Sequence, residues 1–380
     1  MGTYLNPGSI MFRGSLRSQI YIDKSGLIEK TNAVINTEQK YMCISRPRRF
    51  GKSMAVNMLA SYYGKDENTE ALFQDLKISR YQSYREHINQ YDVIRVNMQD
   101  FLSVTNYIDE MLRMLQTRII GELRRKYPEY TEDSQESHLI FVMQDIFSFT
   151  KQPFVILIDE WDCLFREYQQ DWQAQKKYLD FLRAWIKDKE YVALAYMTGI
   201  LPIKKYGLHS ALNMFSEYSM IDSGGMAEFF GFTEDEVKRL CAQYQMNFEE
   251  TKAWYDGYQL TNYHIYCPRS VVECMLHQKF YTYWNQTETY EALKVYIQMD
   301  MDGLKDAVVE MIAGNSVRIS TGTFSNDMTT FAGKDDVLTL LVHLGYLTYN
   351  SNDEAVSIPN REVSQEYINA ITTMDWQISV

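Results

Sequence analysis

The segment from Tyr41 to Gly64 constrains the fold more than any other part of the chain. It joins a short apolar run, "YMCIS", to a basic loop, "RPRRFGKS", and then to a helical pattern. The apolar positions of that pattern share one face: Met54, Met58, Leu59 and Tyr62. The same order of strand, loop and helix forms a phosphate-binding loop, G-x-x-x-x-G-K-S/T. Because Arg46 stands where the first glycine is expected, a chance match is the alternative.

The positions that touch nucleotide in such a loop are intact: Gly51, Lys52 and Ser53. In these loops the amides and the helix N-terminus point at the phosphates, the lysine reaches the β and γ oxygens, and the serine hydroxyl binds Mg²⁺. The replaced positions lie at the start of the loop, where Pro47 removes one amide. Arg48 and Arg49 add positive charge, either to hold the nucleotide or to brace the loop.

A second motif, "FVILIDEWD", ends an apolar run with Asp159 and Glu160. Open α/β sheets bind their ligands at the carboxyl ends of strands. An aspartate there can hold Mg²⁺ through water opposite Ser53, and the adjacent glutamate can polarise the water that attacks the γ-phosphate. The alternative is that the acidic residues simply end the strand on its solvent side.

The order of the motifs favours the functional interpretation. Asp159 follows Lys52 by 107 residues, and the run "VIRVNM" predicts one more strand between them, as in P-loop ATPases that use a catalytic glutamate. A later run, "VALAYMTGI", ends in Thr198, whose hydroxyl can contact the γ-phosphate or the lytic water; a capping or turn threonine is the alternative. We therefore predict Lys52, Glu160 and Thr198 as catalytic residues, and Ser53 and Asp159 as metal ligands.

Four apolar runs of strand type alternate with helical patterns in the first half of the chain: 41–45, 93–98, 154–158 and 192–197. This alternation predicts an α/β fold with a mostly parallel sheet flanked by helices. One helical pattern makes an apolar stripe behind the expected cap Thr105. The stripe contains Ile108, Met111, Leu112, Leu115, Ile119, Ile120 and Leu123.

The composition changes after the Ser-Gly-Gly at 223–225. "FTEDEVKRLCAQY" predicts a helix with a threonine cap and an acidic first turn. Near the C-terminus, one segment predicts a helix capped by Asp335 and stopped at Gly345, and then a hairpin, which together resemble a winged helix. We predict three parts: a P-loop ATPase domain (1–225), a helical subdomain (226–285) and an α+β winged-helix-like subdomain (286–380).

Composition excludes several classes of protein. The 380 residues are 46% hydrophobic, yet no apolar run approaches the roughly 20 residues that cross a bilayer, and the N-terminus lacks a basic-then-apolar export signal. We therefore expect a cytoplasmic protein without membrane contact. The cysteines are scattered without C-x-x-C spacing, which predicts buried thiols rather than disulfides or structural zinc. They are Cys43, Cys163, Cys241, Cys267 and Cys274.

Seven motifs spread over nearly the whole chain resemble the bacterial AAA-like ATPases: "YIDKSGLIE", "SRPRRFGKS", "ILIDEWD", "TGILPIKK", "GFTEDEV", "WYDGY" and "IPNREV". In that family "RPRRFGKS" is the usual form of the Walker A loop, and "ILIDE" corresponds to Walker B. The resemblance implies an ATP-binding domain of the AAA-related class with a helical lid and a small closing subdomain. A PD-(D/E)xK nuclease-like domain usually follows in the family, and we expect it to be absent after Val380.

The resemblance also implies that the segment Tyr21, Ile22, Asp23 and Lys24 lies against the adenine and ribose; an N-terminal strand or helix cap packed on the sheet is the alternative. Where the family often has an aromatic residue, this chain has Arg269, which either senses nucleotide from the lid or lies on the surface. The predicted nucleotide contacts are Tyr21, Asp23, Lys24, Arg48, Arg49, Phe50, Gly51, Lys52, Ser53 and Met54.

A nuclease of that class needs Glu-x-Lys on a strand beside another acidic residue. Glu-x-Lys occurs at 236–238 and 250–252, but both stretches are patterned as helix, so we expect no nuclease site. The formal charge of -12 opposes general nucleic-acid affinity. From Asp335 to Val380 seven acidic residues face one basic residue, Arg361, so this end is not expected to bind DNA. A closing or interaction role is favoured there.

Two functions follow from these patterns. The first is an ATPase in which Mg²⁺-dependent hydrolysis drives or times a conformational change. The second is a nucleotide-regulated interaction module with negligible hydrolysis, which works with a nuclease-like domain or a protein partner. No arginine finger is identified, and without one the basal rate can be very low. An oligomer is compatible with either function.

Overall fold

The computed structural model describes residues 1–131, 136–203, 212–284, 290–299, 301–326 and 328–372. The chain divides into two compact units. Unit 1 contains Met1–Ile44, Lys52–Gly199 and Ile203–Glu217, and unit 2 contains Ser45–Gly51, Ile200–Pro202 and Tyr218–Val380. Among the described residues, no helix is long and apolar enough to cross a membrane. All five cysteines are free and buried, which confirms the predicted buried thiols.

A five-stranded sheet with the order β2-β3-β4-β1-β5 forms the core of unit 1. The strands are β1 (Tyr41–Ser45), β2 (Asp92–Asn97), β3 (Phe154–Asp159), β4 (Val192–Gly199) and β5 (Ser216–Tyr218). β2 pairs with β3, and β3 with β4, in parallel. The four predicted strands and the α/β class are confirmed. The sheet places β4 between β1 and β3, whereas β2, which precedes β3 in the chain, lies at the edge.

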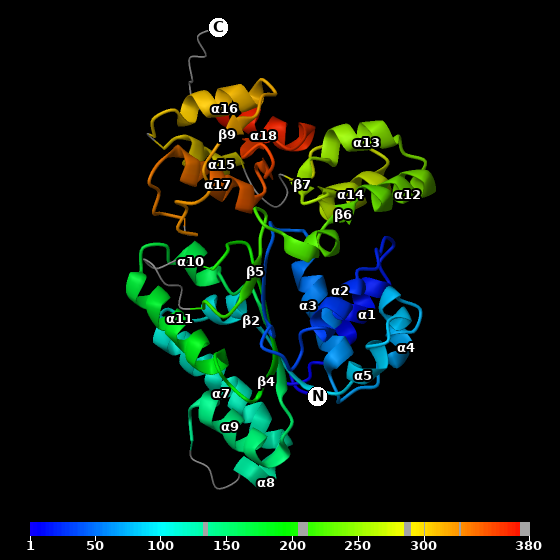
Figure 1. Ribbon diagram of the computed structural model, residues 1–380, viewed down its shortest axis with the longest axis vertical. Helices are drawn as coiled ribbons and strands as arrows, with labels where there is room; N and C mark the ends of the chain where they lie inside the picture. Colours follow the sequence, from blue (N-terminus) through cyan, green and yellow to red (C-terminus); the bar gives the residue numbers. More distant parts are fainter. Residues whose placement is uncertain (132–135, 204–211, 285–289, 300, 327, 373–380) are drawn as a thin grey trace. The chain divides into compact units, whose positions relative to one another are not determined.

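Helices cover both faces of this sheet (Figure 1). One face carries α1 (Ile10–Leu16), α2 (Gly26–Asn32) and α3 (Lys52–Tyr63), and the other carries α7 (Ile108–Lys126), α9 (Leu139–Thr150) and α11 (Trp172–Ile186). Shorter elements connect them: α4 (Glu70–Phe73), η1 (Lys77–Arg80), α5 (Tyr84–His87), α6 (Met98–Leu102), α8 (Pro128–Thr131) and α10 (Cys163–Glu167).

The predicted stripe of α7 is largely confirmed, but its predicted cap is wrong. Residues from Met111 to Leu123 on the stripe are buried. The helix begins at Ile108 with Tyr107 as its N-cap residue. Thr105 instead donates its hydroxyl to the carbonyl of Phe101, because it lies in the turn that ends the preceding helix.

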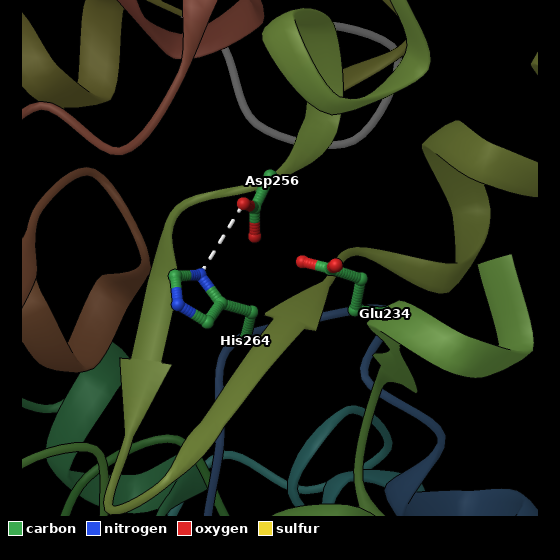
Figure 2. A group of neighbouring side chains, drawn as sticks. All are labelled: Glu234, Asp256 and His264. Carbon is green, nitrogen blue, oxygen red and sulfur yellow. Dashed lines mark ion pairs between the residues drawn. The ribbon is translucent and has the colours of Figure 1, made fainter. Parts of the chain in front are cut away.

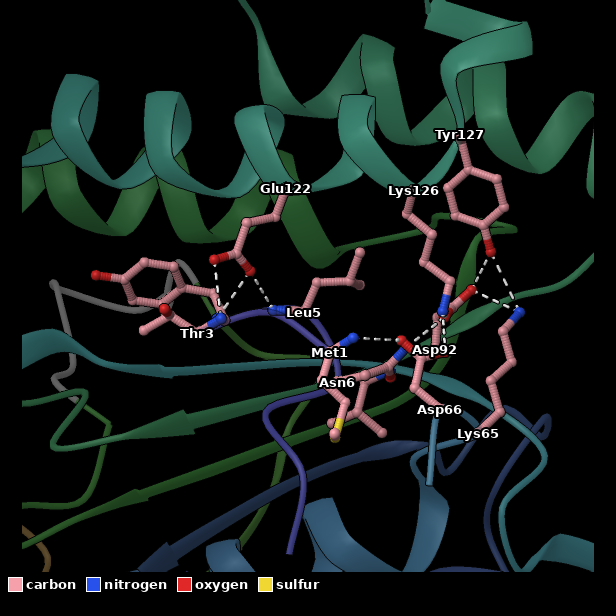
Figure 3. A network of polar contacts seen from close by, with 12 residues as sticks. Met1, Thr3, Leu5, Asn6, Lys65, Asp66, Asp92, Glu122, Lys126 and Tyr127 are labelled. Carbon is pink, nitrogen blue, oxygen red and sulfur yellow. Dashed lines mark hydrogen bonds and ion pairs between the residues drawn. The ribbon is translucent and has the colours of Figure 1, made fainter. Parts of the chain in front are cut away.

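Polar side chains fasten the N-terminal segment to helix α7, and through Asn6 to strand β2, in unit 1 (Figure 3). Glu122 on α7 accepts the backbone amides of Thr3, Tyr4 and Leu5 at 2.7–2.9 Å. Asp92, at the start of β2, is buried and pairs with the ammonium groups of Lys65 at 2.7 Å and Lys126 at 2.8 Å. Burial acts to raise the pKa of the Asp92 carboxyl, but hydrogen bonds from both lysines outweigh it and hold that pKa below its usual value.

The first part of unit 2 combines helices with a small sheet that the sequence pattern did not predict. The antiparallel sheet has the order β6-β8-β7. Its elements are η2 (Gly224–Phe229), β6 (Phe232–Thr233), α12 (Glu234–Tyr244), α13 (Phe248–Tyr255), β7 (Tyr258–Leu260), β8 (Tyr263–Tyr266) and α14 (Pro268–His277). The predicted threonine cap is present as a capping box in which Glu236 accepts the amide of Thr233 at 2.9 Å. Both Glu-x-Lys sequences lie on helices, as predicted.

The second part of unit 2 has the winged-helix-like order of helix, strand, helix and hairpin. Its elements are α15 (Tyr290–Ile297), α16 (Leu304–Ile312), β9 (Val317–Arg318), α17 (Lys334–Leu344), β10 (Thr348–Asn350), β11 (Ala355–Ser357) and α18 (Arg361–Thr372). Gly345 ends α17 in the left-handed region, at φ 88°, as predicted. Asp335 is not the cap, since it lies inside the helix and accepts the amide of Ser320. The domain boundaries at 225 and 286 stay predictions.

Candidate functional site

The first predicted site residue in unit 1, Lys52, is buried at the start of α3. Burial lowers the pKa of its ammonium, while the carboxylates of Glu160, Asp159 and Asp162 oppose that shift. A buried cation is stable only where anions compensate it. The structure therefore brings Lys52 together with both acidic residues of the second motif.

Asp159 is the last residue of β3 and is buried. Its Oδ1 accepts the hydroxyl of Thr198 at 2.6 Å and the backbone amide of Glu160 at 3.0 Å. Its Oδ2 is buried and accepts no hydrogen bond from the residues that the structure describes. A buried carboxylate oxygen without a donor is costly, so this oxygen suits a cation. Ser53, the predicted second ligand, is exposed in the first turn of α3, and the residues present therefore fit Mg²⁺.

Glu160 follows β3 in the left-handed region, at φ 52°, which is uncommon for a residue with a side chain. Its Oε2 forms an ion pair with Nη2 of Arg166. Burial raises the pKa of the Glu160 carboxyl, and the charges of Arg166 and Lys52 oppose that shift. A carboxylate in such an environment can accept a proton as a general base, provided that its ion pair with Arg166 leaves an oxygen available.

Sequence reasoning missed two residues of this group, Asp162 and Arg166. Asp162 is fully buried and precedes α10, and Arg166 pairs with it across one helical turn. The available signal was the second aspartate of "DEWD" followed four residues later by an arginine, the spacing at which opposite charges meet on a helix. It was missed because α10 has only five residues and shows no clear periodicity.

The loop before Lys52 explains why the first glycine of the motif is absent. Arg46 is fully buried in unit 2, where Nη1 donates to the carbonyls of Ser45 and Tyr218 at 2.8 Å each and the guanidinium lies over the ring of Phe230. This side chain therefore braces the start of the loop. Gly51 has a φ of 90°, which glycine adopts without strain.

The remaining loop residues differ in environment. Arg48 and Arg49 have exposed side chains, as does Met54 in the first turn of α3. Phe50 is buried in unit 2, where its ring packs edge-on against Tyr258. Phe50 therefore has a packing role in addition to any contact with nucleotide.

Part of the segment that we predict to lie against the adenine and ribose already makes hydrogen bonds within the protein. Asp23 accepts the amides of Ser25 at 2.8 Å and Lys77 at 2.7 Å, so its carboxylate links two chain segments. Tyr21 is partly buried, and burial raises the pKa of its hydroxyl. The assignment of this segment to nucleotide, including Lys24, stays a prediction.

In unit 2, Arg269 is exposed on α14 and pairs with Glu273 at 2.8 Å.

A separate cluster in unit 2 brings together Glu234, Asp256 and His264, whose possible ligand atoms lie within 4.8 Å of one another (Figure 2). His264 Nδ1 lies 3.3 Å from Asp256 Oδ2. Both oxygens of Glu234 already pair with lysines, at 2.6 Å to Lys238 and 3.0 Å to Lys252. These hydrogen bonds lower the pKa of the Glu234 carboxyl to about 2. The lysines supply the compensating charge, so this cluster is an ion-pair network.

Comparison with known proteins identifies relatives of this chain. A profile of the AAA-ATPase-like family, described as "Predicted AAA-ATPase", matches residues 15–209. A curated protein of Azotobacter chroococcum mcd 1, described as "Uncharacterized protein in vnfD 5'region", is 27% identical over 283 residues. The match covers 71% of this chain and 51% of the relative, so the chain spans about half the length of that protein.

Solved structures with a similar arrangement include a Walker-type ATPase of Pyrococcus abyssi, at 14% identity and a TM-score of 0.44, covering 91% of this chain and 94% of that one. Cdc6p of Pyrobaculum aerophilum has 7% identity and a TM-score of 0.33, covering 96% of this chain and 98% of that one. Values of this size describe a distant likeness and identify no function.

The family profile covers just over half of the 380 residues. It includes the loop that ends in Gly-Lys-Ser, the acidic pair that ends β3 and the threonine of β4. The expected resemblance and the α/β fold class of P-loop ATPases are thereby confirmed. The chain belongs to the AAA-ATPase-like family of predicted AAA-ATPases.

Proposed function

We propose that this chain binds ATP with Mg²⁺ and hydrolyses it, and that the cycle drives or times a conformational change. The observation that carries the proposal is the arrangement at the end of β3. There, a buried lysine interacts electrostatically with a buried aspartate, one oxygen of which has no donor among the described residues, and a glutamate of raised pKa follows directly in the chain. Such a combination of a cation, a metal-type carboxylate and a base is what phosphoryl transfer to water needs.

Each residue has a distinct role in the proposal. Lys52 binds the β and γ oxygens, and Glu160 orients the attacking water and takes its proton. Ser53 and Asp159 would hold Mg²⁺, which neutralises charge on the phosphate oxygens when bound. Thr198 fixes Asp159 through its hydroxyl, so its direct contact with the γ-phosphate stays a prediction.

Other residues are proposed to contact the nucleotide without taking part in the chemistry. Their assignment rests on the family resemblance and on their positions in the chain. They are Tyr21, Asp23, Lys24, Arg48, Arg49, Phe50, Gly51 and Met54.

Phosphate release and ATP titration test the proposal together. We expect Mg²⁺-dependent turnover in the purified protein. Glu160→Gln should keep ATP binding but lose about 100-fold or more in turnover, since a general base contributes roughly that much. Lys52→Ala should lose affinity for ATP. Glu38→Gln, at an exposed glutamate of unit 1, is the matched control and should behave as wild type.

Two outcomes would contradict the proposed hydrolysis. Background turnover in the wild type together with no detectable ATP binding would exclude a nucleotide site. Tight ATP binding without turnover would instead support the interaction module that the sequence also predicts, in which nucleotide binding alone changes the conformation.

A further inference from the structure

Arg166 connects the proposed base to a fixed point in the same unit. Its side chain is 10% exposed on the short helix α10. Nη2 pairs with Oε2 of Glu160, and Nε lies 3.4 Å from Oδ2 of Asp162. A single planar guanidinium therefore bridges two carboxylates, of which one is the proposed base and the other has no proposed role in the chemistry.

The Asp162 end of this bridge is rigid. Its side chain is fully buried, and its carbonyl accepts the amides of Phe165 at 3.0 Å and Arg166 at 3.3 Å in the first turn of α10. The backbone of Arg166 is thus fixed relative to Asp162. Because the guanidinium is planar and delocalised, pairing at one edge also limits the orientation of the other.

The turn that carries Glu160 is held at three further points. The amide of Trp161 donates to the carbonyl of Thr198 at 3.1 Å, and the amide of Cys163 donates to the carbonyl of Glu160 at 3.1 Å. The hydroxyl of Tyr178, on α11, donates to the carbonyl of Trp161 at 2.7 Å. With the backbone fixed, the main freedom left is the rotation of the Glu160 side chain, whose rotamers are worth up to about 2 kcal/mol of entropy.

We propose that Arg166 is a positioning residue for Glu160, which holds the carboxylate in the single orientation from which it activates the attacking water. This inference rests on the proposed ATPase function. A buried ion pair often adds little stability compared with apolar residues of similar volume, so holding an orientation is the better reason for a bridge at this place. Misplacing a catalytic group by about 1 Å can cost roughly 100-fold in rate, which makes such a device effective.

The test compares steady-state ATP hydrolysis in four variants with the wild type. They are Arg166→Gln, Arg166→Lys, Glu160→Gln and the double variant Glu160→Gln/Arg166→Gln. Arg166→Gln should lower kcat about 10- to 100-fold and leave KM and ATP affinity within about twofold. Arg166→Lys keeps the charge but loses the fork, so it should restore part of kcat. The double variant should be no slower than Glu160→Gln, because Arg166 acts only through Glu160.

Arg125→Gln is the matched control, since it removes another arginine of unit 1 that pairs with a glutamate, here Glu122 at 3.8 Å, and the side chain of Arg125 is exposed. It should leave kcat unchanged. If Arg166→Gln fails to fold, the lysine variant decides: a lowered kcat with wild-type ATP affinity supports the proposal, and a wild-type kcat overturns it.

The results also separate this inference from the function on which it rests. A wild type without turnover refutes the ATPase function and the positioning role together. Turnover in the wild type with equal or higher kcat in Arg166→Gln overturns only the positioning role. A double variant that is clearly slower than Glu160→Gln does the same, because it would place the effect of Arg166 elsewhere.

Discussion

The hydroxyl of Thr198 donates to Oδ1 of Asp159 at 2.6 Å, and both side chains are buried. The two residues come from adjacent parallel strands, β4 and β3. The bond uses one carboxylate oxygen, and the other, Oδ2, has no donor in the described part of the chain. Thr198 therefore orients the carboxylate of Asp159, the proposed metal ligand.

Thr198→Val removes this hydroxyl with little change in shape. We expect it to raise the Mg²⁺ concentration needed for half-maximal ATP hydrolysis about 10-fold, since groups that orient a metal ligand contribute roughly that much to metal affinity. Loss of the buried bond should also cost about 1–2 kcal/mol in the free energy of unfolding. Turnover measured over a range of Mg²⁺ concentrations checks the first effect, and urea unfolding checks the second. Thr198→Ser keeps the hydroxyl and serves as the control; an unchanged Mg²⁺ dependence in the valine variant would contradict this role.

Several parts of the site could be predicted from the sequence because they are local. The runs that end in Ser45, Asp159 and Thr198 are short, apolar and followed by polar residues, so their strands and the order of the motifs along the chain were clear. Parallel strands then bring their carboxyl ends to one edge of the sheet. The contact between Asp159 and Thr198 follows from that topology.

Other parts depend on contacts between distant residues. Arg46 appeared to replace a required glycine, and its role became clear only with its hydrogen bond to Tyr218, 172 positions later. The bridge through Arg166 lies on a helix of five residues, too short to show a period. The sheet formed by β6, β7 and β8 was missed because its strands have only two to four residues each.

Arg46→Gly would restore the glycine-led form of the loop, and we expect it to harm the protein. The variant removes a buried side chain that donates to the carbonyls of Ser45 and Tyr218 and contacts the ring of Phe230. The free energy of unfolding should fall by about 2–4 kcal/mol, with no gain in ATP affinity. Denaturant unfolding and ATP titration measure these quantities. Arg48→Gly, at an exposed position of the same loop, should cost much less; equal stability of the two variants would refute the bracing role.

The motif "WYDGY" has no part in the proposed chemistry, and the surroundings of Gly257 explain why it contains a glycine. Gly257 has a φ of 122°, and a Cβ built there would lie 1.8 Å from the carbonyl oxygen of Pro359. Gly257→Ala should therefore displace the backbone and destabilise unit 2 by more than about 4 kcal/mol. Gly314→Ala is the matched control, because Gly314 also has a positive φ, 88°, but no heavy atom of the described residues lies within 4 Å of the added Cβ. It should cost about 1 kcal/mol. Similar thermal unfolding of the two variants would show that the close approach to Pro359 is unimportant.

Glu362 lies buried in the first turn of α18 and accepts the backbone amides of Tyr283 at 2.6 Å and Trp284 at 2.9 Å through Oε1. Burial raises the pKa of its carboxyl from 4.5 to about 7, and these hydrogen bonds oppose that shift. Between these two values the folded chain keeps the proton that the unfolded chain has lost. This difference makes the folded state more stable at the acid end of the window.

The contribution of Glu362 to the free energy of unfolding should therefore fall as the pH rises from about 4.5 to about 7 and remain level above that. Glu362→Gln stays neutral at every pH and keeps an oxygen for the two amides. We expect it to be more stable than the wild type at pH 8, by roughly 1–3 kcal/mol, and to show a weaker pH dependence below pH 7. Urea unfolding across this range measures both effects. Glu249→Gln, at an exposed glutamate of unit 2, should follow the wild-type curve. A Glu362→Gln curve that runs parallel to the wild type would mean that Glu362 does not bind the extra proton.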